Sequence, residues 1–197
     1  MVNVRTLPLG AYQTNCYIAW GEDSDDCIVI DPGYNPETVL FAAKQLGKEI
    51  AGILLTHGHF DHVGAVRGIA EKTGCPVYIH PGDLSQPEEM TAGPLSYTHT
   101  YGEGDTVRLA GLTLRVLSTP GHTPGSVCLL TENTLFSGDT LFQDSIGRTD
   151  FPGGNFAQMR ASLNRLAAME DDLRVLPGHG PATTLHEEKL YNPYLRA

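Results

Sequence analysis

Apolar residues in the first half of the chain follow two periods, one typical of strands and one typical of helices. Continuous runs such as Ile28-Val29-Ile30 and Ile53-Leu54-Leu55 indicate strands that are covered on both faces. After Asn35, a candidate helix N-cap, apolar residues recur on one helical face as far as Gly47. We therefore predict strands near residues 2–7, 15–20, 26–30, 50–55 and 76–79, and helices over 35–47 and 63–73.

The periodicity disappears between residues 81 and 105, where Gly, Pro, Ser and Thr are frequent. This composition predicts a long connection or a lid with at most one short helical turn. Because strands and helices alternate in both halves, we expect a layered α/β fold, built as one domain over residues 1–197. The elements predicted after the lid are strands at 106–109, 112–117, 127–130, 134–136 and 173–176, and helices at 155–169 and 184–191.

Composition and charge exclude several classes of protein. The chain carries 13 Lys and Arg against 23 Asp and Glu, a net charge of −10 that would repel nucleic-acid phosphates. Its apolar runs fall far short of the roughly 20 residues that cross a bilayer. The first residues lack the features of a signal peptide, so we expect a cytoplasmic protein without nucleic-acid or membrane partners.

The four cysteines form no Cys-x-x-Cys motif, so neither a cysteine zinc site nor a redox motif is predicted. Cys27 and Cys128 lie inside predicted strands, where a free cysteine usually acts as a small apolar residue. We expect these thiols to be buried in the core.

The densest group of candidate ligands is Thr56-His57-Gly58-His59-Phe60-Asp61-His62, directly after a predicted strand. In extended backbone, residues two apart point the same way, so His57 and His59 can reach one metal ion. A turn that begins at Asp61 would direct Asp61 and His62 towards a second ion. Open α/β sheets place their sites at this end of a strand.

Two ions need more than four donors, and three further candidates lie at the ends of predicted strands. Gly121-His122-Thr123 offers an imidazole, Gly138-Asp139 offers a carboxylate, and Gly178-His179 offers another imidazole. A carboxylate such as that of Asp139 can bridge two ions, which a single imidazole does not do.

These motifs, in this order, resemble those of the metallo-β-lactamase superfamily across nearly the whole chain. The resemblance implies an αββα sandwich of two mixed sheets with helices on the outer faces, and two metal ions in the cleft between the sheets. Asp31, in Ile30-Asp31-Pro32-Gly33, would support the ligands without binding metal itself. The implied ligands are His57, His59 and His122 for one ion, Asp61, His62 and His179 for the other, and Asp139 for both.

Within this superfamily, the stretch Gly147-Arg148-Thr149-Asp150 and the residues before it resemble the glyoxalase II branch, which hydrolyses hydroxyacyl-glutathione thioesters. Glyoxalase II carries a C-terminal helical domain that holds glutathione, whereas 18 residues follow His179 here. The chain therefore resembles the short, single-domain members of that branch. Arg148 could bind a carboxylate of the substrate or brace its own loop against Asp150.

A small-molecule thioester suits such a site. A hydroxide held between two divalent ions, zinc before iron or manganese, can attack the carbonyl carbon near neutral pH, and Asp61 could orient it. The leaving thiol has a pKa near 8.5, so it departs without a dedicated general acid. We expect a monomer or a small homo-oligomer.

Other activities share the same ligands. A persulfide dioxygenase would use one iron on His57, His122 and Asp139, and its Gly-Arg-Thr-Asp stretch resembles residues 147–150. A lactonase is a further alternative, while the missing signal peptide disfavours an antibiotic hydrolase and the acidic charge disfavours a nuclease. A metal-binding protein without activity would bind metal stoichiometrically but turn over no thioester, lactone or persulfide.

Overall fold

The computed structural model describes residues 1–169 and 172–196, and its N-terminal half forms a six-stranded mixed sheet. The first three strands are antiparallel, and the strands from the third to the sixth run parallel to one another. The sheet follows the chain in the order β1-β2-β3-β4-β5-β6. Its strands are β1 (Val2–Leu9), β2 (Thr14–Gly21), β3 (Asp26–Ile30), β4 (Glu49–Leu54), β5 (Val77–Ile79) and β6 (His99–Thr100).

A second six-stranded sheet follows, in the order β14-β13-β10-β9-β8-β7. Within it β10 and β13 are parallel, and the other neighbours are antiparallel. The strands of this sheet are β7 (Thr106–Leu109), β8 (Leu112–Ser118), β9 (Val127–Thr131), β10 (Thr134–Gly138), β13 (Arg174–Pro177) and β14 (Thr183–Thr184). A small hairpin of β11 (Leu141–Phe142) and β12 (Ser145–Ile146) leaves it after β10.

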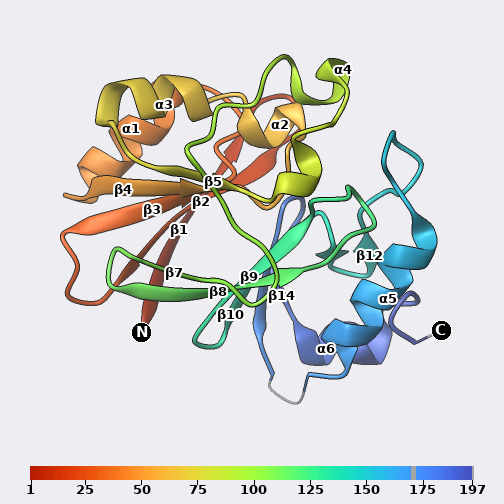
Figure 1. The fold of residues 1–197 in the computed structure, drawn as a ribbon. Helices are drawn as coiled ribbons and strands as arrows, with labels where there is room; N and C mark the ends of the chain where they lie inside the picture. Colours follow the sequence, from red (N-terminus) through yellow and green to blue (C-terminus); the bar gives the residue numbers. More distant parts are fainter. Residues whose placement is uncertain (170–171, 197) are drawn as a thin grey trace.

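The two sheets pack face to face, and helices cover their outer faces, as the αββα expectation requires (Figure 1). On the first sheet lie α1 (Pro36–Gln45) and α3 (Val66–Thr73), and on the second lie α5 (Phe156–Ala167) and α6 (Leu185–Tyr191). The side chain of Asn35 accepts from Thr38 N at the start of α1, which confirms the predicted cap.

The alternation of side chains along β3 shows how one strand serves two layers. Ile28 and Ile30 point into the core between the sheets, whereas Cys27 and Val29 pack under α1 and α3. All four are fully buried, which explains why this strand is a continuous apolar run in the sequence. The described cysteines are free and buried, as expected.

Two predicted elements differ from the structure. The helix expected over 63–73 is divided into α2 (Phe60–Val63) and α3, because the chain at Gly64 packs against the backbone of Gly33, and Ala65 N donates to Pro32 O. The segment 81–105 holds more structure than one helical turn: a 3₁₀ turn, η1 (Pro81–Asp83), a short helix, α4 (Glu88–Thr91), and strand β6. Both differences arise from tertiary contacts that local periodicity does not report.

The helices are short, and α5 has 12 residues. Among residues 1–169 and 172–196, none has the length and apolar character that a membrane span requires.

Candidate metal centre

Loops that leave the parallel strands meet at one edge of the sandwich. Asp31 follows β3, residues 56–62 follow β4, and Asp139 and His179 follow β10 and β13. His122 comes from the connection between β8 and β9. Because the carboxyl ends of neighbouring parallel strands lie together, the fold brings all of these side chains to one place.

The first group of side chains consists of His57, His59 and His122, all buried. One ring nitrogen from each lies within 4.8 Å of the others. The ring of His59 is 4.5 Å from that of His122 between centroids, and the ring of His57 is 4.8 Å from both. Three imidazoles from two loops thus converge on one point.

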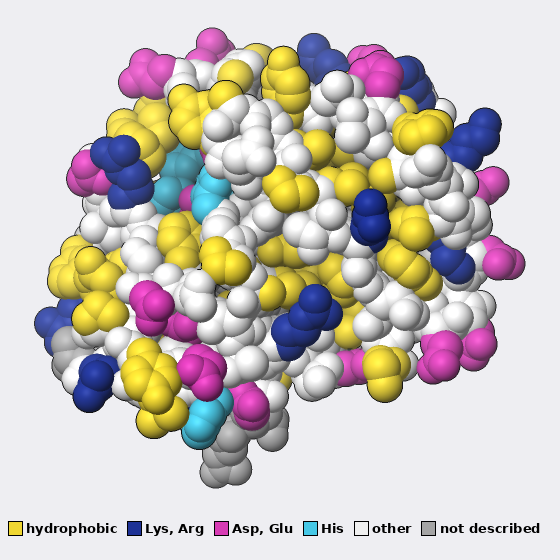
Figure 2. Space-filling view, turned by 180° about the vertical axis from the view of Figure 1, so that it is seen from behind, with side chains coloured by type: hydrophobic (Ala, Val, Ile, Leu, Met, Phe, Trp, Pro, Cys, Tyr) yellow, Lys and Arg dark blue, Asp and Glu magenta, His cyan; other side chains and the backbone are white. Residues whose placement is uncertain are grey.

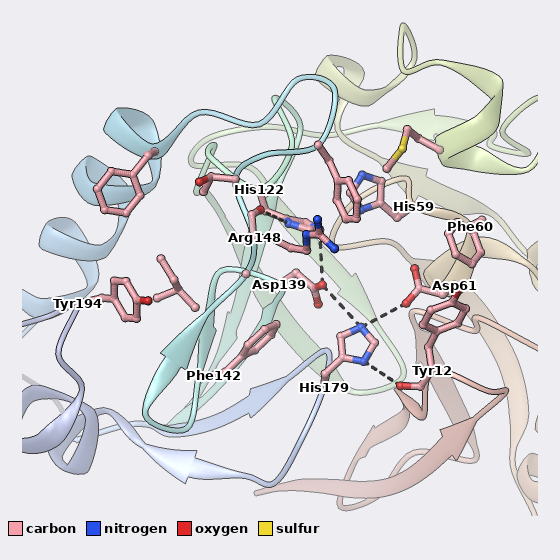
Figure 3. A pocket seen from close by; sticks show the side chains of 16 residues that line it. Tyr12, His59, Phe60, Asp61, His122, Asp139, Phe142, Arg148, His179 and Tyr194 are labelled. Atoms are coloured by element: carbon pink, nitrogen blue, oxygen red, sulfur yellow. Dashed lines mark hydrogen bonds and ion pairs between the residues drawn. The ribbon is translucent and has the colours of Figure 1, made fainter.

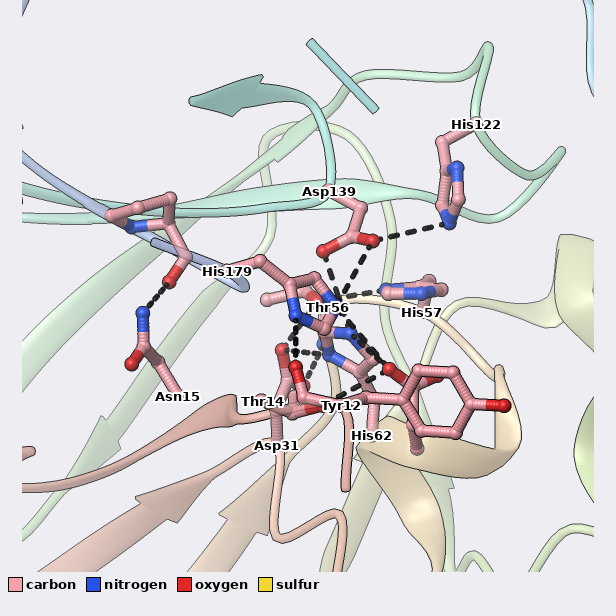
Figure 4. A network of polar contacts seen from close by, with 12 residues as sticks. Tyr12, Thr14, Asn15, Asp31, Thr56, His57, His62, His122, Asp139 and His179 are labelled. Carbon is pink, nitrogen blue, oxygen red and sulfur yellow. Dashed lines mark hydrogen bonds and ion pairs between the residues drawn. The ribbon is translucent and has the colours of Figure 1, made fainter. Parts of the chain in front are cut away.

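The second group consists of Asp61, His62 and His179. Figure 4 shows Asp139 between His122 of the first group and His179 of the second. Asp61 Oδ2 lies 3.2 Å from His179 Nε2 and 3.7 Å from His62 Nε2. Asp139 Oδ1 lies 3.4 Å from His62 Nε2, while its Oδ2 lies 3.5 Å from Nε2 of His122 in the first group. The same Oδ2 lies 3.6 Å from Nε2 of His179 in the second group, so the carboxylate of Asp139 faces both groups.

Several polar atoms at this centre have no hydrogen-bond partner within the described residues. They are buried, and such atoms normally cost free energy unless something binds them. A divalent ion in each group would bind them, because neutral imidazole and carboxylate are suitable ligands for zinc, iron and manganese. The unpartnered atoms are Nε2 of His57, His59, His62 and His122, and Oδ1 of Asp139.

In four of the five histidines at this centre, the other ring nitrogen, Nδ1, has a hydrogen-bond partner. Nδ1 of His62 bonds to Asp31 Oδ2 at 3.0 Å, and Nδ1 of His57 bonds at 3.1 Å to Thr56 Oγ1, which itself donates to Asp31. Nδ1 of His122 and Nδ1 of His179 each bond to a backbone carbonyl. A donor at Nδ1 leaves the lone pair of Nε2 free for a metal, so the anchors set both ring orientation and tautomer. The carbonyl anchors are Arg148 O for His122 and Tyr12 O for His179.

Burial and neighbouring charges shift the pKa values of the ligands in different directions. Burial lowers the pKa of His57 well below its usual value, and it lowers the pKa of His59 to about 4. Burial would raise the pKa of Asp139, but the His62 imidazole beside it makes the net change a decrease. Burial likewise opposes the charge on His62, yet Asp139 and Asp31 raise the pKa of that ring. A proton and a metal ion therefore compete for His62.

A pocket of about 780 Å³ opens directly onto the centre (Figure 3). This volume falls in the range of about 300–1,000 Å³ that small-molecule sites occupy. Figure 2 shows histidine side chains at the base of a hollow in this face. Rings surround the opening, so most of the wall is apolar. The aromatic residues of the lining are Tyr12, Phe60, Phe142, Phe151, Phe156 and Tyr194.

Arg148 is the one Lys or Arg among the described residues that line this pocket. Its guanidinium pairs with both carboxylate oxygens of Asp150, at 2.9 and 2.8 Å, and lies 3.9 Å from the centre of the Phe151 ring. The side chain is 59% exposed. Of the two roles expected for Arg148, the structure shows the brace against Asp150, at a position from which the guanidinium still faces the pocket.

Comparison with known proteins agrees with this geometry. The family model for the metallo-beta-lactamase superfamily matches residues 9–179. The chain belongs to this superfamily. All of the predicted ligands lie within the matched part of the chain.

Several members of the superfamily are similar to this chain over almost their full length. The hydroxyacylglutathione hydrolase GloC of Haemophilus influenzae is 33% identical, with 100% of this chain and 99% of that protein covered. Among solved structures, the BLEG-1 B3 metallo-beta-lactamase has a TM-score of 0.89 at 35% identity, covering 99% of this chain and 100% of that one. TTHA1623 in a di-iron-bound form has a TM-score of 0.86 at 40% identity, covering 98% and 100%.

Three residues that shape the candidate metal centre were not predicted from the sequence. Thr14 Oγ1 donates to Asp61 Oδ2 at 3.0 Å, and the carbonyl of Tyr12 holds His179. Asp83, in the segment predicted to be a long connection or a lid, is fully buried against two of the ligand loops. No local motif marks these residues, because each acts through a partner far away in the sequence.

Proposed function

We propose that this chain hydrolyses a hydroxyacyl thioester such as S-lactoylglutathione and requires two divalent metal ions. The observation that carries the proposal is the position of the Asp139 carboxylate, which faces two ligand groups at the base of a pocket. The full-length similarity to a hydroxyacylglutathione hydrolase supports the choice of substrate.

We assign the ligands to the two ions as the resemblance implies. His57, His59 and His122 would hold one ion, and Asp61, His62 and His179 would hold the other. Asp139 would bridge the ions. We propose zinc first, with iron or manganese as alternatives, since this mixture of imidazole and carboxylate suits all three metals.

Ions bound at such a centre lower the pKa of water and polarise a substrate carbonyl. The side chains around the centre would hold the attacking water and the substrate in place. Asp61 has a 16% exposed side chain at the edge of the pocket, and the hydroxyl of Thr14 fixes its Oδ2. Asp61 would accept a hydrogen bond from the attacking water and orient its lone pair towards the thioester carbonyl carbon.

The pocket wall suits the rest of the substrate. Its aromatic rings exclude bulk water from the reacting carbonyl, which strengthens the electrostatic interactions there. Arg148 would bind a carboxylate of the thiol portion at the pocket mouth, in competition with Asp150. The leaving thiolate needs no proton from an acidic side chain.

The test is hydrolysis of S-lactoylglutathione by purified protein loaded separately with zinc, manganese or iron, followed as loss of thioester absorbance. The proposal predicts turnover with at least one metal. Absence of turnover with all three, on protein that has bound the metal, would overturn the proposed substrate. Oxygen uptake on glutathione persulfide by the iron form would then identify the dioxygenase alternative.

A further inference from the structure

A buried carboxylate outside the predicted ligand set lies between the two loops that form the first ligand group. Asp83 ends η1, and its side chain is completely inaccessible to solvent. An ionised carboxylate in such a position is costly unless hydrogen bonds compensate for the lost water.

Three hydrogen-bond donors contact this carboxylate, and they come from two different loops. Asp83 Oδ2 accepts from Gly58 N at 2.7 Å, in the residue between His57 and His59. Its Oδ1 accepts from Gly125 N at 2.7 Å, in the loop that carries His122. The hydroxyl of Thr123, the residue after His122, donates to Oδ2 at 2.9 Å. One carboxylate thus connects the loop of His57 and His59 to the loop of His122.

The fit around this carboxylate is close. A methyl group added at Gly125 would lie 2.6 Å from Asp83 Oδ1, and one added at Gly58 would lie 3.3 Å from Asp83 Cβ. No larger residue can stand at Gly125 without displacing the carboxylate. The size of the Asp83 side chain therefore determines the distance between the two loops.

We propose that Asp83 is a positioning residue that sets the spacing of the His57, His59 and His122 imidazoles, and this role rests on the proposed metal centre. The carboxylate contacts neither group of ligand atoms directly. It acts through Gly58 and Thr123, each adjacent in sequence to a ligand. The second ligand group has its own anchors, so Asp83 controls one metal position of the two.

The isosteric variant Asp83→Asn separates this role from simple packing. Its side chain has the same size, but the amide nitrogen cannot accept a hydrogen bond. Either Gly58 N or Gly125 N would then face the amide NH₂ group, which is another donor. One of the two loops would lose its hydrogen bond to residue 83, while the space in the core stays filled.

Glu188 offers a matched control, because it is a buried carboxylate with three donors away from the centre. It accepts from Asp144 N at 2.9 Å, from Thr183 Oγ1 at 2.6 Å and from Asn192 Nδ2 at 2.8 Å. Glu188→Gln should lower the thermal stability of the metal-free chain about as much as Asp83→Asn does, without changing metal affinity.

The experiment titrates metal-free wild type, Asp83→Asn and Glu188→Gln with cobalt(II), and records bound ions per chain and the visible absorption of each site. Circular dichroism checks that each variant is folded. We expect Asp83→Asn to bind one of its two ions at least tenfold more weakly and to change the spectrum of that site alone. Equal binding of both ions by Asp83→Asn and wild type, or the same loss in Glu188→Gln, would overturn the role of Asp83. A wild type that binds no ion would instead refute the proposed function, and this role with it.

Discussion

Nδ1 of His62 donates to Oδ2 of Asp31 across 3.0 Å, and the opposite nitrogen of the same ring faces Asp139. Asp31 also accepts from the backbone and the hydroxyl of Thr56. It therefore aligns ligands in both groups, directly through His62 and indirectly through Thr56 and His57.

Asp31→Asn tests that alignment. Asp31 has a φ of 51°, a conformation that Asn tolerates at least as well, so the substitution changes hydrogen bonding without new backbone strain. We expect metal affinity to fall about 10–100-fold, the usual effect of losing such a support. Competition with a chelator measures it, and unchanged affinity would show that Asp31 acts only in folding.

Gly178→Ala tests whether the backbone after β13 must lie close to Asp139 and His62. A Cβ at Gly178 would lie 2.1 Å from Asp139 Oδ1 and 2.7 Å from His62 Cε1, so both side chains would have to move. We expect at least a tenfold loss of affinity for metal, measured by the same competition. Gly102→Ala is the control, because its Cβ would meet nothing closer than 3.7 Å. Similar behaviour of the two variants would contradict the argument.

Arg148→Ala tests recognition at the mouth of the pocket. Because the guanidinium is exposed and already paired with Asp150, its loss should raise KM for S-lactoylglutathione severalfold and leave kcat within about twofold. Arg160→Ala, on the exposed side of α5, should change neither constant. A large decrease in kcat with an unchanged KM would assign Arg148 to the chemical step instead.

The buried thiol of Cys27 should make the free energy of unfolding fall as the pH becomes alkaline. Burial raises the pKa of this thiol from 9.0 to about 12. The folded chain keeps the thiol neutral where the unfolded chain ionises it, so its contribution to stability is complete below pH 9 and is lost as pH rises towards 12. Between pH 8 and pH 10, the loss amounts to about 1.4 kcal/mol.

Urea unfolding of wild type and Cys27→Ala at both pH values measures this contribution. The free energy of unfolding of the wild type should fall by about 1.4 kcal/mol more than that of the variant. Equal decreases would show that the thiol ionises as easily in the folded chain as in the unfolded one.

The sequence was most informative where chemistry and strand ends coincide. His57, Asp139 and His179 each lie shortly after a predicted apolar strand, so the local pattern predicted that they lie at the edge of a sheet. The buried runs at 28–30 and 53–55 likewise located central strands, because strands covered on both faces are continuously apolar.

The parts that could not be predicted depend on contacts between distant residues. The break between α2 and α3 comes from packing at Gly33, and the anchor of His179 is the carbonyl of Tyr12, 167 residues away. Asp83 lies in a segment without periodicity, and its importance is visible only once the loops at Gly58 and Gly125 stand on either side of it.

The most direct test of the account is a titration of metal-free protein with zinc, in which bound ions per chain and the rate of S-lactoylglutathione hydrolysis are measured together. We predict that the rate reaches its maximum at two ions per chain. Asp139→Ala should bind fewer ions and lose at least 100-fold in rate, while His186→Ala, an exposed histidine, should match the wild type. Two bound ions without turnover, or an Asp139→Ala protein as active as the wild type, would contradict the account.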